Sequence, residues 1–142
     1  MTTLAANKAR TYEFNEDPLY EDVGLIASDI IYAGAAVGES SSSGTARPLV
    51  AADTFLGFAV GKADNSSGSA SDITVRLRKK GTVKIPVTGA ASAADVGATV
   101  YADDDNAFTL TSSSNSSIGK VTRWISSTTC MVRFEAVMVR SL

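Results

Sequence analysis

Short runs of alternating apolar and polar residues cover most of the chain from residue 30 onward. The clearest run spans residues 73–78, where three apolar side chains share one face of an extended strand and Thr74, Arg76 and Arg78 share the other. We expect the apolar face to be buried and the polar face to meet solvent. The pattern predicts eight strands, at Ile30–Val37, Phe55–Gly61, Ile73–Leu77, Val83–Val87, Ala98–Tyr101, Phe108–Leu110, Ile118–Trp124 and Cys130–Val139.

Clusters of turn-forming residues separate these runs. They lie at 38–44, 64–69, 103–106 and 112–117 and are rich in Ser, Gly, Asn and Asp, which tolerate turn geometry. Many short strands with turn signals roughly every ten residues are typical of antiparallel sandwiches and barrels. We therefore predict an all-β fold, a small jelly-roll, β-sandwich or barrel-like domain with an extended N-terminal arm.

Two local features refine this prediction. Gly81 separates the run at 73–78 from the next strand, so it marks either a hairpin turn or a bulge in one long bent strand. The alanine-rich stretch 90–97 predicts about one helical turn, which would serve as a connector.

Residues 1–22 differ from the remainder and are assigned to the arm, with 23–142 as a single β-rich domain. The arm has neither helical nor strictly alternating periodicity, yet it carries the aromatic residues Tyr12, Phe14 and Tyr20. Exposed rings cost free energy in water, so we expect the arm to pack against a surface. That surface belongs either to another chain or to the arm's own domain.

Composition removes most common site chemistry. The chain has no histidine and one cysteine, Cys130, which excludes Ser-His-Asp and Cys-His catalytic sets, histidine-bearing zinc sites and an intrachain disulfide. We expect no enzyme activity, no metal and no cofactor. The net charge of -2 disfavours nucleic acid as a partner. Short apolar stretches and the absence of a secretory signal predict no membrane association.

Charge is concentrated at two places in the sequence. Arg76, Arg78, Lys79 and Lys80 form the densest positive run, which is either a solvated strand face or a docking patch for an acidic partner. The acidic run Asp103–Asp105 lacks the spacing of a calcium loop, so we expect a solvated hairpin tip, with a weak cation site as the alternative. The candidate interface residues are therefore Tyr12, Phe14, Tyr20, Arg76, Arg78, Lys79 and Lys80.

Several sequence elements follow one another in a characteristic order from about Asp29 to the end of the chain. They include an x-Gly-Phe-Ala strand, a strand ending in Gly and Pro, a "DVGxxVY" turn and a closing Ile-Gly-Lys-Val strand. The segments that contain them are Ser28–Gly38, Ala46–Val50, Phe55–Asn65, Val75–Val87, Asp95–Asp105 and Ile118–Val121. Taken in order, these elements resemble the head decoration, or cement, proteins of tailed bacteriophages and prophages.

The resemblance implies a structural virion protein, made in the bacterial host cytoplasm, that binds the outer surface of the assembled capsid. It would cement neighbouring major capsid protein subunits, as a homo-oligomer (dimer or trimer), and stabilise the shell against internal DNA pressure. A β-rich adhesin or receptor-binding module of a phage or cell surface is the alternative, because exposed Ser- and Thr-rich loops also suit that role.

Overall fold

The structure, a computed structural model, describes residues 3–13, 19–40 and 44–136, and its regular elements in these ranges are antiparallel β-strands and one short 3-10 turn. The predicted all-β class is confirmed. The first sheet has six strands in the spatial order β1 (Thr11–Tyr12), β9 (Lys80–Pro86), β13 (Thr129–Glu135), β12 (Ser116–Ser126), β10 (Thr99–Ala102) and β11 (Phe108–Thr109). The second has five, in the order β2 (Tyr20–Gly24), β8 (Thr74–Arg78), β6 (Phe55–Ala59), β4 (Ala36–Glu39) and β5 (Ala46–Pro48). A two-stranded sheet pairs β3 (Asp29–Ile31) with β7 (Ala63–Asn65).

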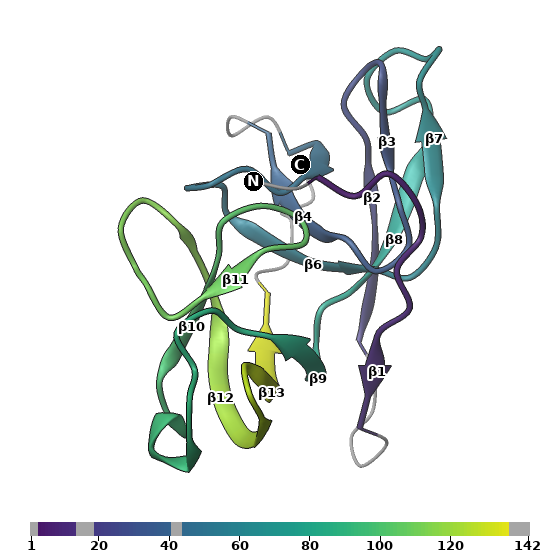
Figure 1. The fold of residues 1–142 in the computed structure, drawn as a ribbon. Coiled ribbons are helices and arrows are strands. Elements are labelled where there is room, and N and C mark those ends of the chain that lie inside the picture. Colours follow the sequence, from purple (N-terminus) through teal and green to yellow (C-terminus); the bar gives the residue numbers. More distant parts are fainter. Residues whose placement is uncertain (1–2, 14–18, 41–43, 137–142) are drawn as a thin grey trace.

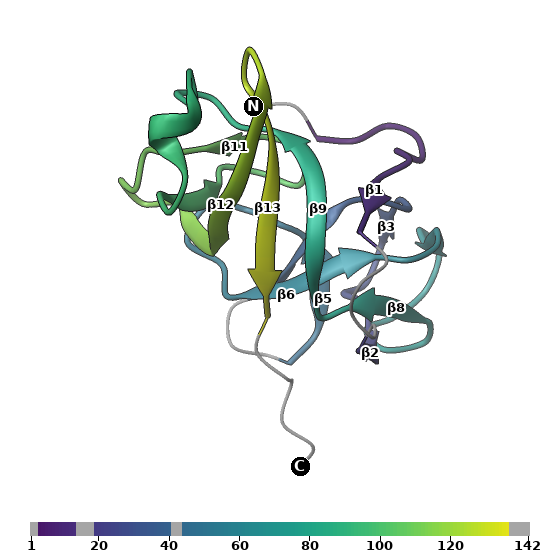
Figure 2. The same ribbon diagram turned by 90° about the horizontal axis from the view of Figure 1, so that it is seen from below.

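The central strand of the five-stranded sheet, β6, is buried on both faces. Figure 2 shows β6 running across β9 and β13, and the core between the two large sheets centres on Phe58 and Phe134, whose ring centroids lie 4.9 Å apart. A second core lies on the other face of β6, around Leu56 and Ile31. Because both faces of β6 meet apolar side chains, all five of its residues are buried.

A bulge at Gly57 allows β6 to serve both cores. The register between β4 and β6 shifts beside this residue, so Phe55 and Phe58 reach one core while Leu56 reaches the other. Gly57 has a φ of 130°, and an added Cβ would lie 2.5 Å from the carbonyl oxygen of Arg78. Only glycine fits both the backbone conformation and this close approach.

The chain changes sheets at Lys79. β8 ends at Arg78 in the five-stranded sheet and β9 begins at Lys80 in the six-stranded sheet, a bend that is visible in Figure 2. Gly81 lies within β9, opposite Phe134 of β13. Of the two alternatives for Gly81, the structure therefore has a bent path and not a hairpin.

One predicted strand is divided, and the others are found where the pattern placed them. The run Ile30–Val37 forms β3 and β4 with a turn between them, because Gly34 adopts a φ of 87°. A side chain at Gly34 would collide with the backbone of Lys8, which crosses directly over it. The end of the last predicted strand, beyond Ala136, lies outside the described residues.

The predicted connector is a single 3-10 turn, η1 (Ala93–Asp95). The Ser92 hydroxyl accepts a hydrogen bond from the Ala94 amide, and the Asp95 carboxylate accepts from the Ser92 amide, which together form a capping box. In the described part of the chain, no helix is long and apolar enough to span a membrane.

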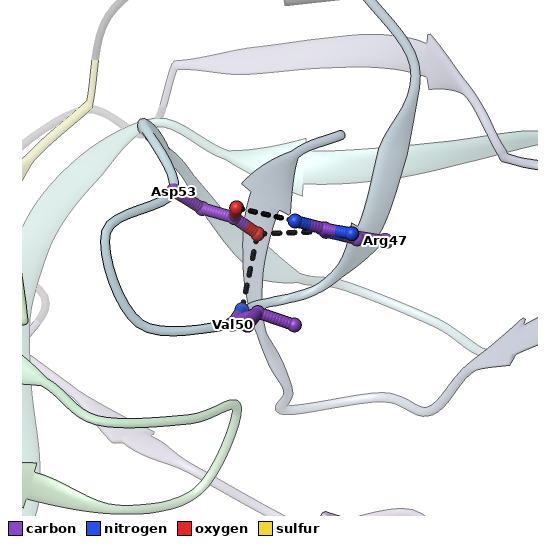
Figure 3. Close-up of polar contacts among 3 residues, drawn as sticks. All are labelled: Arg47, Val50 and Asp53. Carbon is purple, nitrogen blue, oxygen red and sulfur yellow. Dashed lines mark hydrogen bonds and ion pairs between the residues drawn. The ribbon is translucent and has the colours of Figure 1, made fainter. Parts of the chain in front are cut away.

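An ion pair closes the loop between β5 and β6, as Figure 3 shows. Arg47 donates two hydrogen bonds to the Asp53 carboxylate, at 2.9 and 2.7 Å, and the Val50 amide donates a third at 3.0 Å. The Asp53 side chain is 7% exposed, so these bonds form largely out of water. The hydrogen bonding of its guanidinium to the Asp53 carboxylate raises the pKa of Arg47.

We predict that Asp53→Ala destabilises the fold by about 1–3 kcal/mol, because the Arg47 guanidinium and the Val50 amide both lose their acceptor. Asp53→Asn, which keeps one acceptor oxygen, should fall between Asp53→Ala and the parent chain. Urea unfolding, followed by circular dichroism, measures the free energy of unfolding of the parent chain and both variants. Equal stability of all three proteins would contradict the role given to this pair.

Candidate functional site

Three of the seven predicted interface residues surround one pocket on the side of the molecule where β1, β2 and β8 lie close together (Figure 1). Tyr12 comes from β1, Tyr20 from β2 and Arg78 from the end of β8. Phe14 lies outside the described residues. We call this hollow, of about 200 Å³, the Tyr12 pocket. Its larger lining side chains are Lys8, Arg10, Tyr12, Tyr20, Val60 and Arg78, and small residues, Ala9, Ala33, Gly34 and Ala59, complete the lining.

Strand pairing brings these side chains together. Tyr20 lies opposite Arg78 in the β2–β8 pair, and Tyr12 lies opposite Val83 in the β1–β9 pair. Because β9 continues from β8 through the bend at Lys79, β1 ends beside Arg78 although it belongs to the other large sheet. The two predicted aromatic residues of the arm therefore meet the predicted basic run.

The guanidinium of Arg78 stacks over the ring of Tyr12, with its central carbon 4.2 Å from the ring centroid. The Nε atom of Arg78 is buried and has no hydrogen-bond partner. Burial raises the pKa of Tyr12 to about 12, although the nearby Arg78 and Arg10 charges act in the opposite direction. Tyr12 therefore keeps its hydroxyl proton at neutral pH.

The N-terminal segment, residues 3–13, completes the pocket by packing on its own domain. The Lys8 amide donates to the Ala33 carbonyl at 2.8 Å, and the Arg10 Nε donates to the Gly34 carbonyl at 2.8 Å. Arg10 also donates to the Asn106 side chain at 2.9 Å and lies over the rings of Phe58 and Phe108. Of the two alternatives for the arm, these contacts are those of a segment that covers its own domain.

The basic run does not form one exposed strand face. Arg76 is exposed and forms an ion pair with Asp22 across the β2–β8 pair at 2.9 Å, which raises the pKa of Arg76 and lowers that of Asp22. Arg78 turns onto Tyr12, and Lys80 begins the next sheet. The prediction of a continuous four-residue patch is wrong, because the chain bends inside the run.

Lys79 is the clearest correction, because its side chain is 1% exposed. The ammonium donates to the Leu56 carbonyl beside the bulge and pairs with Glu21 at 3.0 Å. Burial lowers the pKa of Lys79, against the opposing effect of Glu21. Lys79 is therefore a structural residue at the bend and is inaccessible to a partner.

The acidic run at 103–105 joins β10 to β11 but is not a solvated tip. Asp104 and Asp105 are 2% and 1% exposed. The Leu4 amide donates to both oxygens of Asp105, at 3.2 and 3.3 Å, and the Ala36 amide donates to its backbone carbonyl. The N-terminal segment covers the tip, and this burial raises the pKa of Asp105 to about 6.

The sequence-based prediction did not include Lys8, Arg10 or Val60 in the site. Val60 follows β6 and is 49% exposed, which is high for an aliphatic side chain at the rim of a pocket. Arg10 had a weak sequence signal, because it lies two residues before Tyr12 in an extended segment and so shares its side.

No group of three or more metal-ligating side chains lies together within the described ranges. Cys130 is buried, as its apolar context predicts, and burial raises the pKa of its thiol. A scan of protein-family models finds none that matches the chain, and a search of curated proteins finds no similar sequence.

We predict that Lys79→Met destabilises the protein by about 2–4 kcal/mol, because the Leu56 carbonyl loses its donor and Glu21 loses the ammonium. Lys80→Met, at the neighbouring and partly exposed position, should change stability by less than about 0.5 kcal/mol. Urea unfolding of both variants measures the difference. Equal effects would show that the buried ammonium adds nothing to the bend.

The raised pKa of Asp105 predicts a pH-dependent cost to stability. Its pKa rises from 3.8 to about 6 on folding, so the folded protein holds the proton more tightly. The contribution of this residue to stability therefore falls as pH rises from about 4 to 6 and stays low above that. Asp105→Asn removes this charge and keeps an acceptor for Leu4.

The expected result is a variant that gains stability relative to the parent chain as pH rises through this window, by at most about 3 kcal/mol above pH 6. Urea unfolding at pH 4, 5, 6 and 7 gives the difference between the two proteins. Asp103→Asn is the control, because Asp103 lies in the same turn, directly after β10. A difference that is independent of pH would contradict this assignment.

Proposed function

We propose that this protein is a capsid decoration protein of a tailed bacteriophage, which binds the outer face of the assembled head and cements neighbouring major capsid protein subunits. The ordered sequence elements described above support the family, and the all-β body is compatible with it. The observation that carries a binding role is the Tyr12 pocket, where Tyr20 and Val60 are 44% and 49% exposed beside the stacked guanidinium of Arg78.

Such a surface has the composition of an interface centre. Interfaces are enriched in Tyr and Arg, and a few such residues carry most of the binding energy. Leu19 adds an exposed apolar side chain immediately before β2. In this proposal, the rigid sheets hold these side chains in place before binding, which reduces the entropy cost of association.

The effect on the capsid follows from linkage. A protein that binds the assembled shell and not its separated subunits stabilises the shell by about 2.7 kcal/mol per site at a hundredfold excess over Kd. A homo-oligomer, a dimer or trimer, would bind several subunits at once and gain from the high effective concentration after the first contact. Many such sites would oppose the outward pressure of packaged DNA.

The test is co-sedimentation of the purified protein with mature heads that lack it, assembled from the major capsid protein of the same phage. We expect saturable binding and a higher temperature of head disruption. Val60→Glu should weaken binding by about tenfold or more, because it places a charge on an exposed apolar contact at the rim of the pocket.

Val96→Glu is the matched control, because Val96 is 50% exposed and lies after η1, away from the pocket lining. Equal binding by both variants would place the interface elsewhere. Failure of the parent protein to bind heads would reject the decoration role, and binding to whole cells or glycans instead would support the adhesin alternative.

A further inference from the structure

The Tyr12 pocket carries an excess of positive charge on one side of a mildly acidic protein. Lys8 and Arg10 come from the N-terminal segment and Arg78 from the end of β8, and no acidic residue is among the described residues that line the pocket. The chain as a whole has a net charge of -2. The local field therefore favours an anionic group, although the whole molecule does not.

The three cations are held in different ways. Arg10 donates to the Gly34 carbonyl and to the Asn106 side chain, and these two hydrogen bonds fix the position of its charge in the pocket lining. Lys8 is anchored through its backbone, and it is exposed. Arg78 is fixed by stacking on Tyr12, but its Nε has no hydrogen-bond partner.

A buried donor without an acceptor is uncommon in folded proteins and costs free energy. The Nε of Arg78 is such a donor, but it is buried beside Gly81, so an anion in the pocket would meet the other N–H groups of this lining residue. A guanidinium whose plane is fixed by an aromatic ring is suited to a carboxylate, because the fork of N–H groups matches two oxygens in one plane.

The rest of the lining is apolar. Tyr20 and Val60 are both substantially exposed at the rim, and the hollow is about 200 Å³, a size suited to one side chain. An anion that carries no apolar part, such as inorganic phosphate, would leave this rim in contact with water. The lining therefore matches a carboxylate on a short aliphatic stem next to an apolar residue.

We propose that the Tyr12 pocket binds an acidic side chain, Asp or Glu, of a partner protein, flanked in that protein by an apolar residue. The carboxylate meets Arg78 under the field of Lys8 and Arg10, and the apolar neighbour packs on Tyr20 and Val60. That the partner is the capsid protein rests on the proposed function. The choice of a carboxylate rests on the pocket itself.

The first test needs no capsid. The isotope-labelled full chain is titrated with a blocked dipeptide, acetyl-Leu-Glu-amide, while backbone amide shifts are followed by NMR. We expect saturable shifts at Gly34, Ala59 and Val60, and at least tenfold weaker binding of acetyl-Leu-Gln-amide. Equal binding of the two dipeptides, no shifts at all, or tighter binding of inorganic phosphate would each overturn the assignment.

Variants assign the interaction to residues. Arg78→Met should weaken the binding of acetyl-Leu-Glu-amide at least tenfold. Lys8→Gln, at an exposed position, should weaken this binding severalfold. It tests the contribution of the positive field even if Arg78→Met fails to fold. Lys120→Gln is the control, because Lys120 is exposed and lies on β12 outside the pocket lining. An effect of Lys120→Gln equal to that of Lys8→Gln would reduce the binding to general charge attraction and overturn the proposal.

The chain's own acidic residues are tested as a competing occupant. Glu16 and Asp17 follow β1 in the sequence, and a Glu16→Gln, Asp17→Asn double variant that binds the dipeptide several times more tightly would assign the pocket to this chain instead of a partner. Unchanged affinity supports a partner carboxylate.

Capsid binding then separates the two proposals. If heads bind the parent protein and Arg78→Met equally, the pocket inference fails and the decoration role stands. If the dipeptide binds as expected but heads do not bind the parent protein, the decoration role fails and the carboxylate pocket stands.

Discussion

A buried ammonium group, that of Lys79, lies where the chain passes from the five-stranded sheet of this protein to the six-stranded sheet. Lys79 bonds to the Leu56 carbonyl of β6 and to Glu21 of β2, while its own backbone bonds to Leu19 and Ala136. The side chain is removed from water, so both charges depend on each other for solvation. This single residue therefore connects β2, β6 and the end of β13, and the bend that it stabilises sets the relative placement of β8 and β9.

The pocket is a consequence of that bend. Arg78 is the last residue before it, and β1 pairs with β9 just after it, so Tyr12 comes to lie on the guanidinium of Arg78. The bulge at Gly57 makes room for the same corner, since its missing side chain lets the Arg78 carbonyl approach. Gly57, Arg78 and Tyr12 thus take part both in core packing and in the candidate binding surface. A substitution at one of them therefore affects the fold as well as the pocket.

The N-terminal segment links the pocket to a second buried charge. Leu4 bonds to Asp105, and Arg10 bonds to Asn106 next to it, so the acidic turn between β10 and β11 fixes the segment that supplies two of the pocket's cations. Burying Asp105 costs free energy at neutral pH, which the chain tolerates because the segment covers the core around Phe58 and Phe108. The pocket's charge therefore depends on contacts made over 90 residues away in the sequence.

Local patterning determined the all-β class and the position of seven of the eight predicted strands, because alternation with period two and turn residues act between near neighbours. It also singled out Tyr12, Tyr20 and Arg78. Tertiary structure decided which charges are exposed: Lys79 and Asp105, polar in any local pattern, are buried because segments distant in sequence cover them. It also split the strand at Gly34 and added Lys8, Arg10 and Val60 to the pocket. Whether a residue is buried depends on which segments pack together. The periodicity along one strand does not specify which segment packs against it.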